Sequence, residues 1–427
     1  MAPSFDRTEL PSGVHVLTER LAEVRSISLG FWIDTGSRDE TPAEQGLSHF
    51  LEHMLFKGTP SLNALGIAEA FDHIGADINA ATGREHTSIY SRVLEDYLPQ
   101  AIEMVMDMAQ HSLIDARELD SERKVVLEEI NMHNDSPDEL VHDYFARVLW
   151  GDHPIGHSVL GTEDNINTVD RDFFLEFYRH RYVTSRVVVA AAGAVDHGLI
   201  CDLVTEHLKD MSPGEAADRS DAMPTPLSGT SITRKDTEQA HIVIGGKGLA
   251  RRDPDRFALS VMDNILGGSM SSRLFQRVRE QLGLVYSIYS YNALFIGMGM
   301  VGIYAGTHPK QAAQVIGLIE EELAKVRDGG FSGEEMVRAK NHIKGSLYIG
   351  NEDSGSRMNR LAKAELAGGE HLTIEEMVER VESVAIDDIH KVFDETWAAV
   401  PLSLAVIGPF DEGDLSLSVD LTGRRDA

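Results

Sequence analysis

Hydrophobic positions in the early part of the chain follow two periods, one typical of strands and one typical of helices. Alternating apolar residues, many of them β-branched, predict strands at His15–Leu21, Ile27–Thr35, Asp77–Ala81 and His86–Val93. Apolar residues three and four positions apart predict helices at Pro42–Phe56, Asn63–Ile74, Glu95–Ser112 and Ala116–His133. Thr41 and Pro42 suit the N-cap and N1 positions of the first helix. This part of the chain therefore mixes strands and helices.

A similar order of elements recurs after residue 230. The apolar stretch Val187–Val195 predicts a buried strand followed by a helix to about Lys209, and Ser212–Thr230 gathers proline, glycine and small polar residues as linkers do. Beyond it we predict strands at Ser231–Arg234, His241–Gly245, Val285–Tyr291, Gly297–Tyr304 and Leu402–Val406, a helix at Asp253–Leu266 and long helices from Pro309 to about Phe393. The predicted division is a domain at 1–212, a linker at 213–230 and a domain at 231–427.

Short stretches of the two parts are also weakly similar in sequence. The pairs are Glu52–Leu55 with Asp263–Leu266, Asn134–Ser136 with Glu352–Ser354, and Val189–Asp196 with Leu404–Asp411. Their separation is about one domain length, which is the mark of an internal repeat. If the repeat is real, the second copy carries Ser260, Asp263 and Asn264 where the first carries His49, Glu52 and His53. Chance similarity between two helices of similar pattern is the alternative.

Composition sets limits on compartment and partners. The 427 residues, 42% hydrophobic and 25% charged, suit a globular protein of two or more domains. No segment is long and apolar enough to predict a membrane span. Cys201 is the only cysteine, which excludes an intrachain disulfide and favours the reducing cytoplasm. The net charge of -30 argues against nucleic acid and favours cationic partners such as basic peptides, although it also fits a solvated acidic surface.

The pentapeptide HFLEH, residues 49 to 53, contains residue types that can bind a metal ion and transfer a proton. On a helix, His49 and His53 stand one turn apart on the same face, and Glu52 falls on that stripe. This is the inverted order of the HExxH zinc signature, in which two neutral imidazoles bind Zn²⁺ and the glutamate takes a proton from water. We therefore predict a Zn²⁺ site with Glu52 as the general base.

A catalytic zinc usually has a third protein ligand. Within the acidic helix that ends near His133, the candidates are Glu128, Glu129 and His133, and Glu122 lies two turns before Glu129 on nearly the same face. Glu128 is turned about 100° from Glu129, so at most one of the two faces the site. Spacing within this helix leaves the choice open.

The stretch EQGLSHFLEHMLFKGT, from Glu44 to Thr59, resembles the signature of the pitrilysin/insulinase metallopeptidases, in the branch of mitochondrial processing peptidase and its bacterial relatives. The resemblance implies that the third ligand is Glu129 and that Glu122 supports the site. It extends over Asn79–Leu94, Gly151–Thr162, Thr237–Gly245 and Ile265–Ile288. It thus implies an α+β fold of two homologous domains, each an antiparallel β-sheet flanked by α-helices, the second without the metal motif.

The same resemblance assigns residues outside the metal motif. In REQLGLVY it implies that Arg279 and Tyr286 belong to the catalytic apparatus, where both side chains suit donation to a carbonyl oxygen that becomes negative. Arg277 is an alternative with a different spacing to Tyr286. The resemblance also implies a strand that binds the substrate backbone, comprising Asn79, Ala80, Ala81 and Thr82.

The metal motif predicts a zinc endopeptidase, and the family resemblance implies that it works as a homodimer or as a heterodimer with an inactive homologue. The glycine-rich loop of the noncatalytic processing-peptidase subunit is reduced here to Gly267 and Gly268, which favours an active chain. One rival is a scaffold subunit of the same family that has kept the metal motif. A second is another HxxEH enzyme, such as a lyase with a catalytic cysteine, but Cys201 lies in a helix-like context far from the motif.

Overall fold

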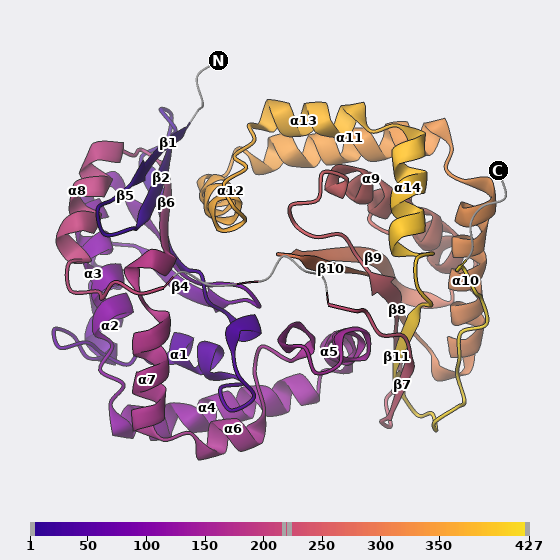
Figure 1. Ribbon diagram of the computed structural model, residues 1–427, viewed down its shortest axis with the longest axis horizontal. Helices are drawn as coiled ribbons and strands as arrows, with labels where there is room; N and C mark the ends of the chain where they lie inside the picture. Colours follow the sequence, from indigo (N-terminus) through magenta and orange to yellow (C-terminus); the bar gives the residue numbers. More distant parts are fainter. Residues whose placement is uncertain (1–4, 216–218, 220–223, 423–427) are drawn as a thin grey trace. The chain divides into compact units, whose positions relative to one another are not determined.

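The computed structural model describes residues 5–215, 219 and 224–422, which form two compact units (Figure 1). The first unit takes its residues from Met1–Met132, His157–Asp218 and Tyr348–Thr373, and the second from His133–Gly156, Arg219–Leu347 and Ile374–Ala427. Each unit is built around one β-sheet. No described helix is long and apolar enough to cross a membrane.

The sheet of the first unit has six strands and is antiparallel except at one pair. Its order is β1 (Phe5–Glu9), β2 (His15–Arg20), β6 (Val187–Gly193), β3 (Ser26–Ile33), β5 (Thr87–Leu94) and β4 (Asp77–Thr82). The exception is β2 beside β6, which run parallel. The central strands β3 and β6 are almost wholly buried, because both faces of the sheet are covered.

Helices from different parts of the chain surround this sheet. They are α1 (Leu47–Leu55), α2 (Ala64–His73), α3 (Leu98–His111), α4 (Ala116–Asn134), α6 (Glu163–Thr168), α7 (Arg171–Arg181), α8 (His197–His207) and α12 (Ser354–Leu366). Of these, α1, α2, α3, α8 and α12 contact its strands directly. The main core lies under α1 and α3, with Phe31 and Phe50 fully buried. A smaller core holds Trp32 against Met358 of α12. Figure 1 shows α12 beside this sheet although it lies late in the sequence.

The sheet of the second unit has five strands in the order β7 (Thr230–Arg234), β11 (Ser403–Gly408), β8 (Ala240–Lys247), β10 (Met298–Thr307) and β9 (Val285–Phe295). Its helices are α5 (Pro137–Trp150), α9 (Arg256–Leu266), α10 (Ala312–Gly329), α11 (Gly333–Gly350), α13 (Ile374–Ser383) and α14 (Ile386–Thr396). The main core packs α9, α10 and α14 on one face, and α5 covers β8 and β11 through a second cluster that includes Phe145.

The two sheets have the same topology. Strands β2, β6, β3, β5 and β4 of the first unit correspond in order and direction to β7, β11, β8, β10 and β9 of the second, including one parallel pair at the same place. The α+β architecture of two related units is therefore confirmed. Each sheet is antiparallel apart from one pair, β2–β6 or β7–β11, because the last strand of each half returns beside an early strand in the same direction.

The compact units differ from the segments 1–212 and 231–427 through an exchange of helices. Helix α5 comes from the first segment and packs on the second sheet, whereas α12 comes from the second segment and packs on the first. Periodicity shows that a helix has an apolar face but not which sheet that face covers. The predicted linker 213–230 includes residues 216–218 and 220–223, which lie outside the described residues. These boundaries stay a prediction.

The metal-motif helix begins later than its pattern predicts. Helix α1 starts at Leu47 with Gly46 as N-cap, so Thr41 and Pro42 precede the helix. Gly46 has a φ of 92°, and a Cβ there would lie 2.7 Å from the carbonyl oxygen of Leu160. The backbone N–H groups of Gly46 and Ser48 both donate to the buried Glu40 carboxylate. Tertiary contacts therefore fix the start of α1, and propensity alone does not reveal them.

Candidate metal centre

Helix α1 presents two imidazoles side by side. Its apolar residues Leu47, Phe50, Leu51 and Met54 are fully buried, which turns the opposite stripe of the helix toward α4. His49 and His53 lie one turn apart on that stripe, with ring centroids 4.7 Å apart. The core contacts of α1 thereby hold both rings in place.

Helix α4 supplies one carboxylate to this pair. Oε2 of Glu129 lies 3.5 Å from Nε2 of His49 and 3.3 Å from Nε2 of His53. Glu128 is exposed, and His133 instead contacts Glu139 and Asp143. Of the candidates that the sequence leaves open, the structure brings Glu129 to the histidines.

The three donor atoms fit Zn²⁺. A tetrahedral site with bonds of about 2.0–2.1 Å separates its ligand atoms by roughly 3.3–3.4 Å, close to both distances from Glu129. All three atoms lie within 4.8 Å of one another, and within the described part of the chain no other group of three such side chains does so. Burial, with a smaller contribution from His53, lowers the pKa of His49 to about 4, which leaves a neutral imidazole free to bind a metal ion.

Glu122 orients one of the two imidazoles. Its Oε1 atom lies 2.9 Å from Nδ1 of His53, and the carboxylate is buried. A proton held on Nδ1 by this contact leaves the lone pair on Nε2 of His53, the ring nitrogen nearest Glu129, available for a metal ion. The second oxygen of Glu122 contacts Lys57 at 2.5 Å. Sequence reasoning missed Lys57, although the residue lies within the stretch that carries the family resemblance.

Glu52 stands beside the histidines with a hydroxyl donor of its own. The Thr82 hydroxyl donates a hydrogen bond of 2.5 Å to Oε2 of Glu52. Burial raises the pKa of Glu52, and the hydrogen bond from Thr82 opposes that rise. A carboxylate made more basic by burial is suited to accept a proton from water near neutral pH.

Comparisons with known proteins find relatives that match almost the whole chain. Residues 15–163 match the family described as insulinase (peptidase family M16), and residues 168–343 match the peptidase M16 inactive domain. An uncharacterized zinc protease of Streptomyces coelicolor is 43% identical over 96% of this chain and 91% of its own length. The chain belongs to peptidase family M16. The uncharacterized zinc protease YmxG of Bacillus subtilis is 40% identical over 93% of this chain and 97% of its own length.

Two solved structures share the fold. A peptidase M16 inactive domain from Pseudomonas fluorescens has a TM-score of 0.90 at 20% identity and covers 95% of this chain and 98% of its own. A protease from Helicobacter pylori has a TM-score of 0.87 at 22% identity, with 95% and 100% covered. At these identities the likeness concerns the fold alone.

The predicted substrate strand of this M16 chain is the edge strand β4. Asn79, Ala80, Ala81 and Thr82 pair with β5, and within the described residues β4 has no second neighbour. An open edge of this kind can accept an added strand. The hydroxyl of Thr82 already donates a hydrogen bond to Glu52, so any contact of Thr82 with a peptide would involve its backbone.

The predicted pair Arg279 and Tyr286 lies in the second unit. Arg279 belongs to the π-helical segment Phe275–Gln281, and Tyr286 lies in β9 with 79% of its surface exposed. The Arg279 guanidinium lies 5.5 Å from the centre of the Tyr286 ring. The alternative Arg277 instead contacts Gln281. Arg279 and Tyr286 thus form a pair within their own unit.

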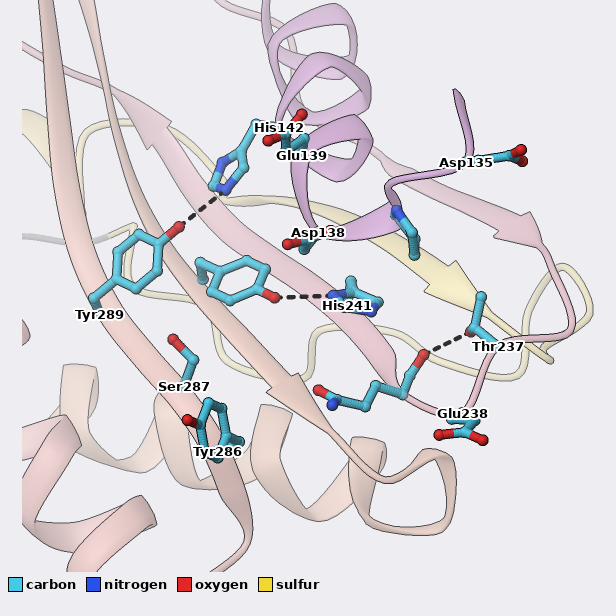
Figure 2. Close-up of a pocket in the computed structure, with 13 residues that line it drawn as sticks. Asp135, Asp138, Glu139, His142, Thr237, Glu238, His241, Tyr286, Ser287 and Tyr289 are labelled. Atoms are coloured by element: carbon cyan, nitrogen blue, oxygen red, sulfur yellow. Dashed lines mark hydrogen bonds between the residues drawn. The ribbon is translucent and has the colours of Figure 1, made fainter. Parts of the chain in front are cut away.

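The second unit also contains an acidic pocket with aromatic walls (Figure 2). Its volume is about 710 Å³, and it opens between α5 and strands β8, β9 and β10. Among the described residues that line it, four are acidic and none is lysine or arginine. Burial, and next the charge of Asp138, raise the pKa of both Tyr289 and Tyr304. Sequence reasoning missed this pocket because it did not predict α5.

Proposed function

We propose that this chain is a zinc-dependent endopeptidase that cleaves peptides or unfolded segments. The observation that carries the proposal is the convergence of Nε2 of His49, Nε2 of His53 and Oε2 of Glu129 within 4.8 Å. Relatives that cover almost the whole chain bear the name zinc protease, which supports the same assignment.

His49, His53 and Glu129 would hold the metal ion. Zn²⁺, when bound there, supplies a Lewis acid that polarises a carbonyl and lowers the pKa of water towards about 7. Glu52 takes the proton from the attacking water and returns it to the leaving amine. Thr82 holds the Glu52 carboxylate in place during both transfers through its hydrogen bond.

Two further elements would act on the peptide. The open edge of β4 would bind the substrate as an added strand, which recognises the backbone more than the side chains. Arg279 and Tyr286 would donate hydrogen bonds to the carbonyl oxygen as it becomes negative. Replacement of Tyr286 by Phe removes only the donor, so a fall in kcat with little change in KM is the expected kinetic signature.

We also propose that basic peptides are preferred. The acidic pocket and the net charge of -30 both attract cations. As assembly and location we propose a homodimer, or a heterodimer with an inactive homologue, in the cytoplasm. Light scattering tests the assembly, and a fully active monomer would contradict it.

Cleavage of a quenched fluorescent peptide tests the enzyme. Glu129→Gln and a chelator should each abolish cleavage, since both remove the metal ion. Glu128→Gln is a matched control because this neighbouring glutamate is exposed and is not among the clustered donors. Cleavage that survives both the chelator and Glu129→Gln would instead favour a scaffold subunit and a contaminating peptidase.

A further inference from the structure

Lys57 occupies a fixed place just after helix α1. Its backbone N–H donates to the carbonyl oxygen of Met54, and the next residue, Gly58, accepts a hydrogen bond from Leu113 and forms a β-bridge with Asn63. The backbone is thus held on both sides of Lys57. The side chain is 27% exposed, and its ammonium points inward to Glu122.

Glu122 has two oxygens and two different partners. Oε1 lies 2.9 Å from Nδ1 of His53, and Oε2 lies 2.5 Å from Nζ of Lys57. The Glu122 side chain is only 8% exposed. A buried carboxylate is costly without a counter-charge, and a neutral imidazole supplies none. Lys57 therefore supplies the positive charge that compensates the Glu122 carboxylate, which the contact with a neutral imidazole does not.

The contact also fixes the direction of the carboxylate. With Oε2 held by Lys57, Oε1 remains directed at Nδ1 of His53. This keeps Nε2 of the same ring directed at Glu129. Residues that hydrogen-bond to the ligands of a metal ion commonly orient those ligands in this way. Without Lys57 the Glu122 carboxylate would be free to rotate about its last bond and to turn its charge toward solvent.

We propose that Lys57 is a positioning residue of the zinc site, which acts through Glu122 on His53 and thereby sets the affinity for Zn²⁺. This inference rests on the proposed zinc site but not on cleavage of any substrate. A lysine that served only as a surface counter-ion would leave the affinity unchanged.

Competition with a chromogenic chelator measures the zinc affinity of the full-length protein without an assay of activity. Lys57→Met should weaken zinc binding by about 10-fold, the lower end of the range for residues that orient metal ligands through hydrogen bonds. Lys57→Arg keeps the charge and should restore most of the affinity. Lys124→Met, on the exposed side of α4, is the matched control and should bind as the unmodified protein does.

A double-mutant cycle separates positioning from a general loss of stability. If Lys57 acts through Glu122, then Lys57→Met should add little to the loss caused by Glu122→Gln. Equal zinc affinities for Lys57→Met and Lys124→Met, or full additivity with Glu122→Gln, would overturn the proposal. If the unmodified protein binds zinc and cleaves peptide in that case, the proposed function still holds. If it binds no zinc at all, both ideas fail.

Discussion

Helices α1 and α9 occupy the same place in two sheets of the same topology, yet their polar residues are arranged differently. In α1, the donor atoms of His49 and His53 converge with Glu129, and Nδ1 of His49 is buried without a hydrogen-bond partner among the described residues. In α9, Asn264 contacts His342 at 2.9 Å and Asp263 accepts a hydrogen bond from Asn292. The polar residues of α9 are therefore satisfied by neighbours, whereas those of α1 have space for an ion between them.

This comparison shows that the same fold occurs with and without the metal motif. The apolar face of each helix packs into its core in the same way, so the scaffold does not depend on the metal motif. Replacement of two imidazoles by a hydroxyl and an amide removes the ligands while the packing remains. Burial raises the pKa of Asp263 to about 6, so even the acidic residue of α9 is partly neutral near that pH.

The largest expected effect is a loss of kcat when Glu52 is replaced, with no such loss when Asp263, at the corresponding place in α9, is replaced. Glu52→Gln should lower kcat by roughly 10²- to 10⁴-fold, the usual contribution of a general base, because the amide does not accept the proton. Bound zinc should remain, because Glu52 is not a predicted ligand. Asp263→Asn makes the same kind of change in α9 and should leave kcat within about twofold, since a neutral side chain already suits that place.

Peptide-cleavage kinetics and metal analysis on the two purified variants provide the measurement. A comparable loss in Asp263→Asn would mean that α9 takes part in catalysis. Glu52→Gln with full activity would remove the general base from the proposed mechanism.

A smaller effect concerns stability at acid pH and one glutamate in each unit, the buried Glu365 and the partly buried Glu335. Burial alone would raise the pKa of Glu365 in the first unit, but hydrogen bonds from His371 and Arg7 outweigh it and lower the pKa to about 2. Burial of Glu335 in the second unit is likewise outweighed, by Arg273 and Ser332, and its pKa is also about 2. Each carboxylate therefore favours the folded state when it is ionised.

The sign of the pH dependence follows from these depressed pKa values. The stabilisation is complete above the unfolded pKa of about 4.3 and is lost as the pH falls towards about 2. Its upper limit is about 3 kcal/mol for each group, with solvent screening reducing it. Glu365→Gln and Glu335→Gln should each lower the free energy of unfolding at pH 7 and flatten its slope between pH 4.5 and pH 2.

Urea unfolding at a series of pH values measures this slope. Glu334→Gln is the control, because this residue is exposed and its contact with Arg338 is 3.9 Å long. An unchanged slope in either variant would show that the corresponding ion pair does not stabilise its unit.

Much of the first unit and its site could be predicted from local pattern. The i, i+4 spacing of His49 and His53 places two ligands on one helix face, and it needs no knowledge of the rest of the fold. The prediction of Glu129 as the third ligand could not be made from local pattern, because spacing within α4 did not distinguish it from Glu128. The family resemblance made that choice, and the structure agrees by turning Glu128 to solvent.

What could not be predicted depends on contacts between distant segments. The Gly46 N-cap depends on the approach of Leu160, and the contact of Lys57 with Glu122 joins a residue just after the end of α1 to a residue of α4. Helix α5 was not predicted from the sequence, and only tertiary packing brings that helix onto the second sheet, where it lines the pocket. Helix periodicity predicts that an apolar face exists, whereas its partner is decided by the whole fold.

The smallest expected effect tests whether the acidic pocket of the second unit selects cationic peptides. Asp138→Asn should raise KM for an arginine-containing peptide by up to about fivefold, or ~1 kcal/mol, with kcat unchanged, because an exposed charge contributes about that much. The effect should fall in 0.5 M salt, where charges are screened beyond a few ångströms. Asp236→Asn removes an exposed acid outside the pocket lining and serves as the control. Equal KM changes in the two variants, or no dependence on salt, would show that the acidity only solvates the surface.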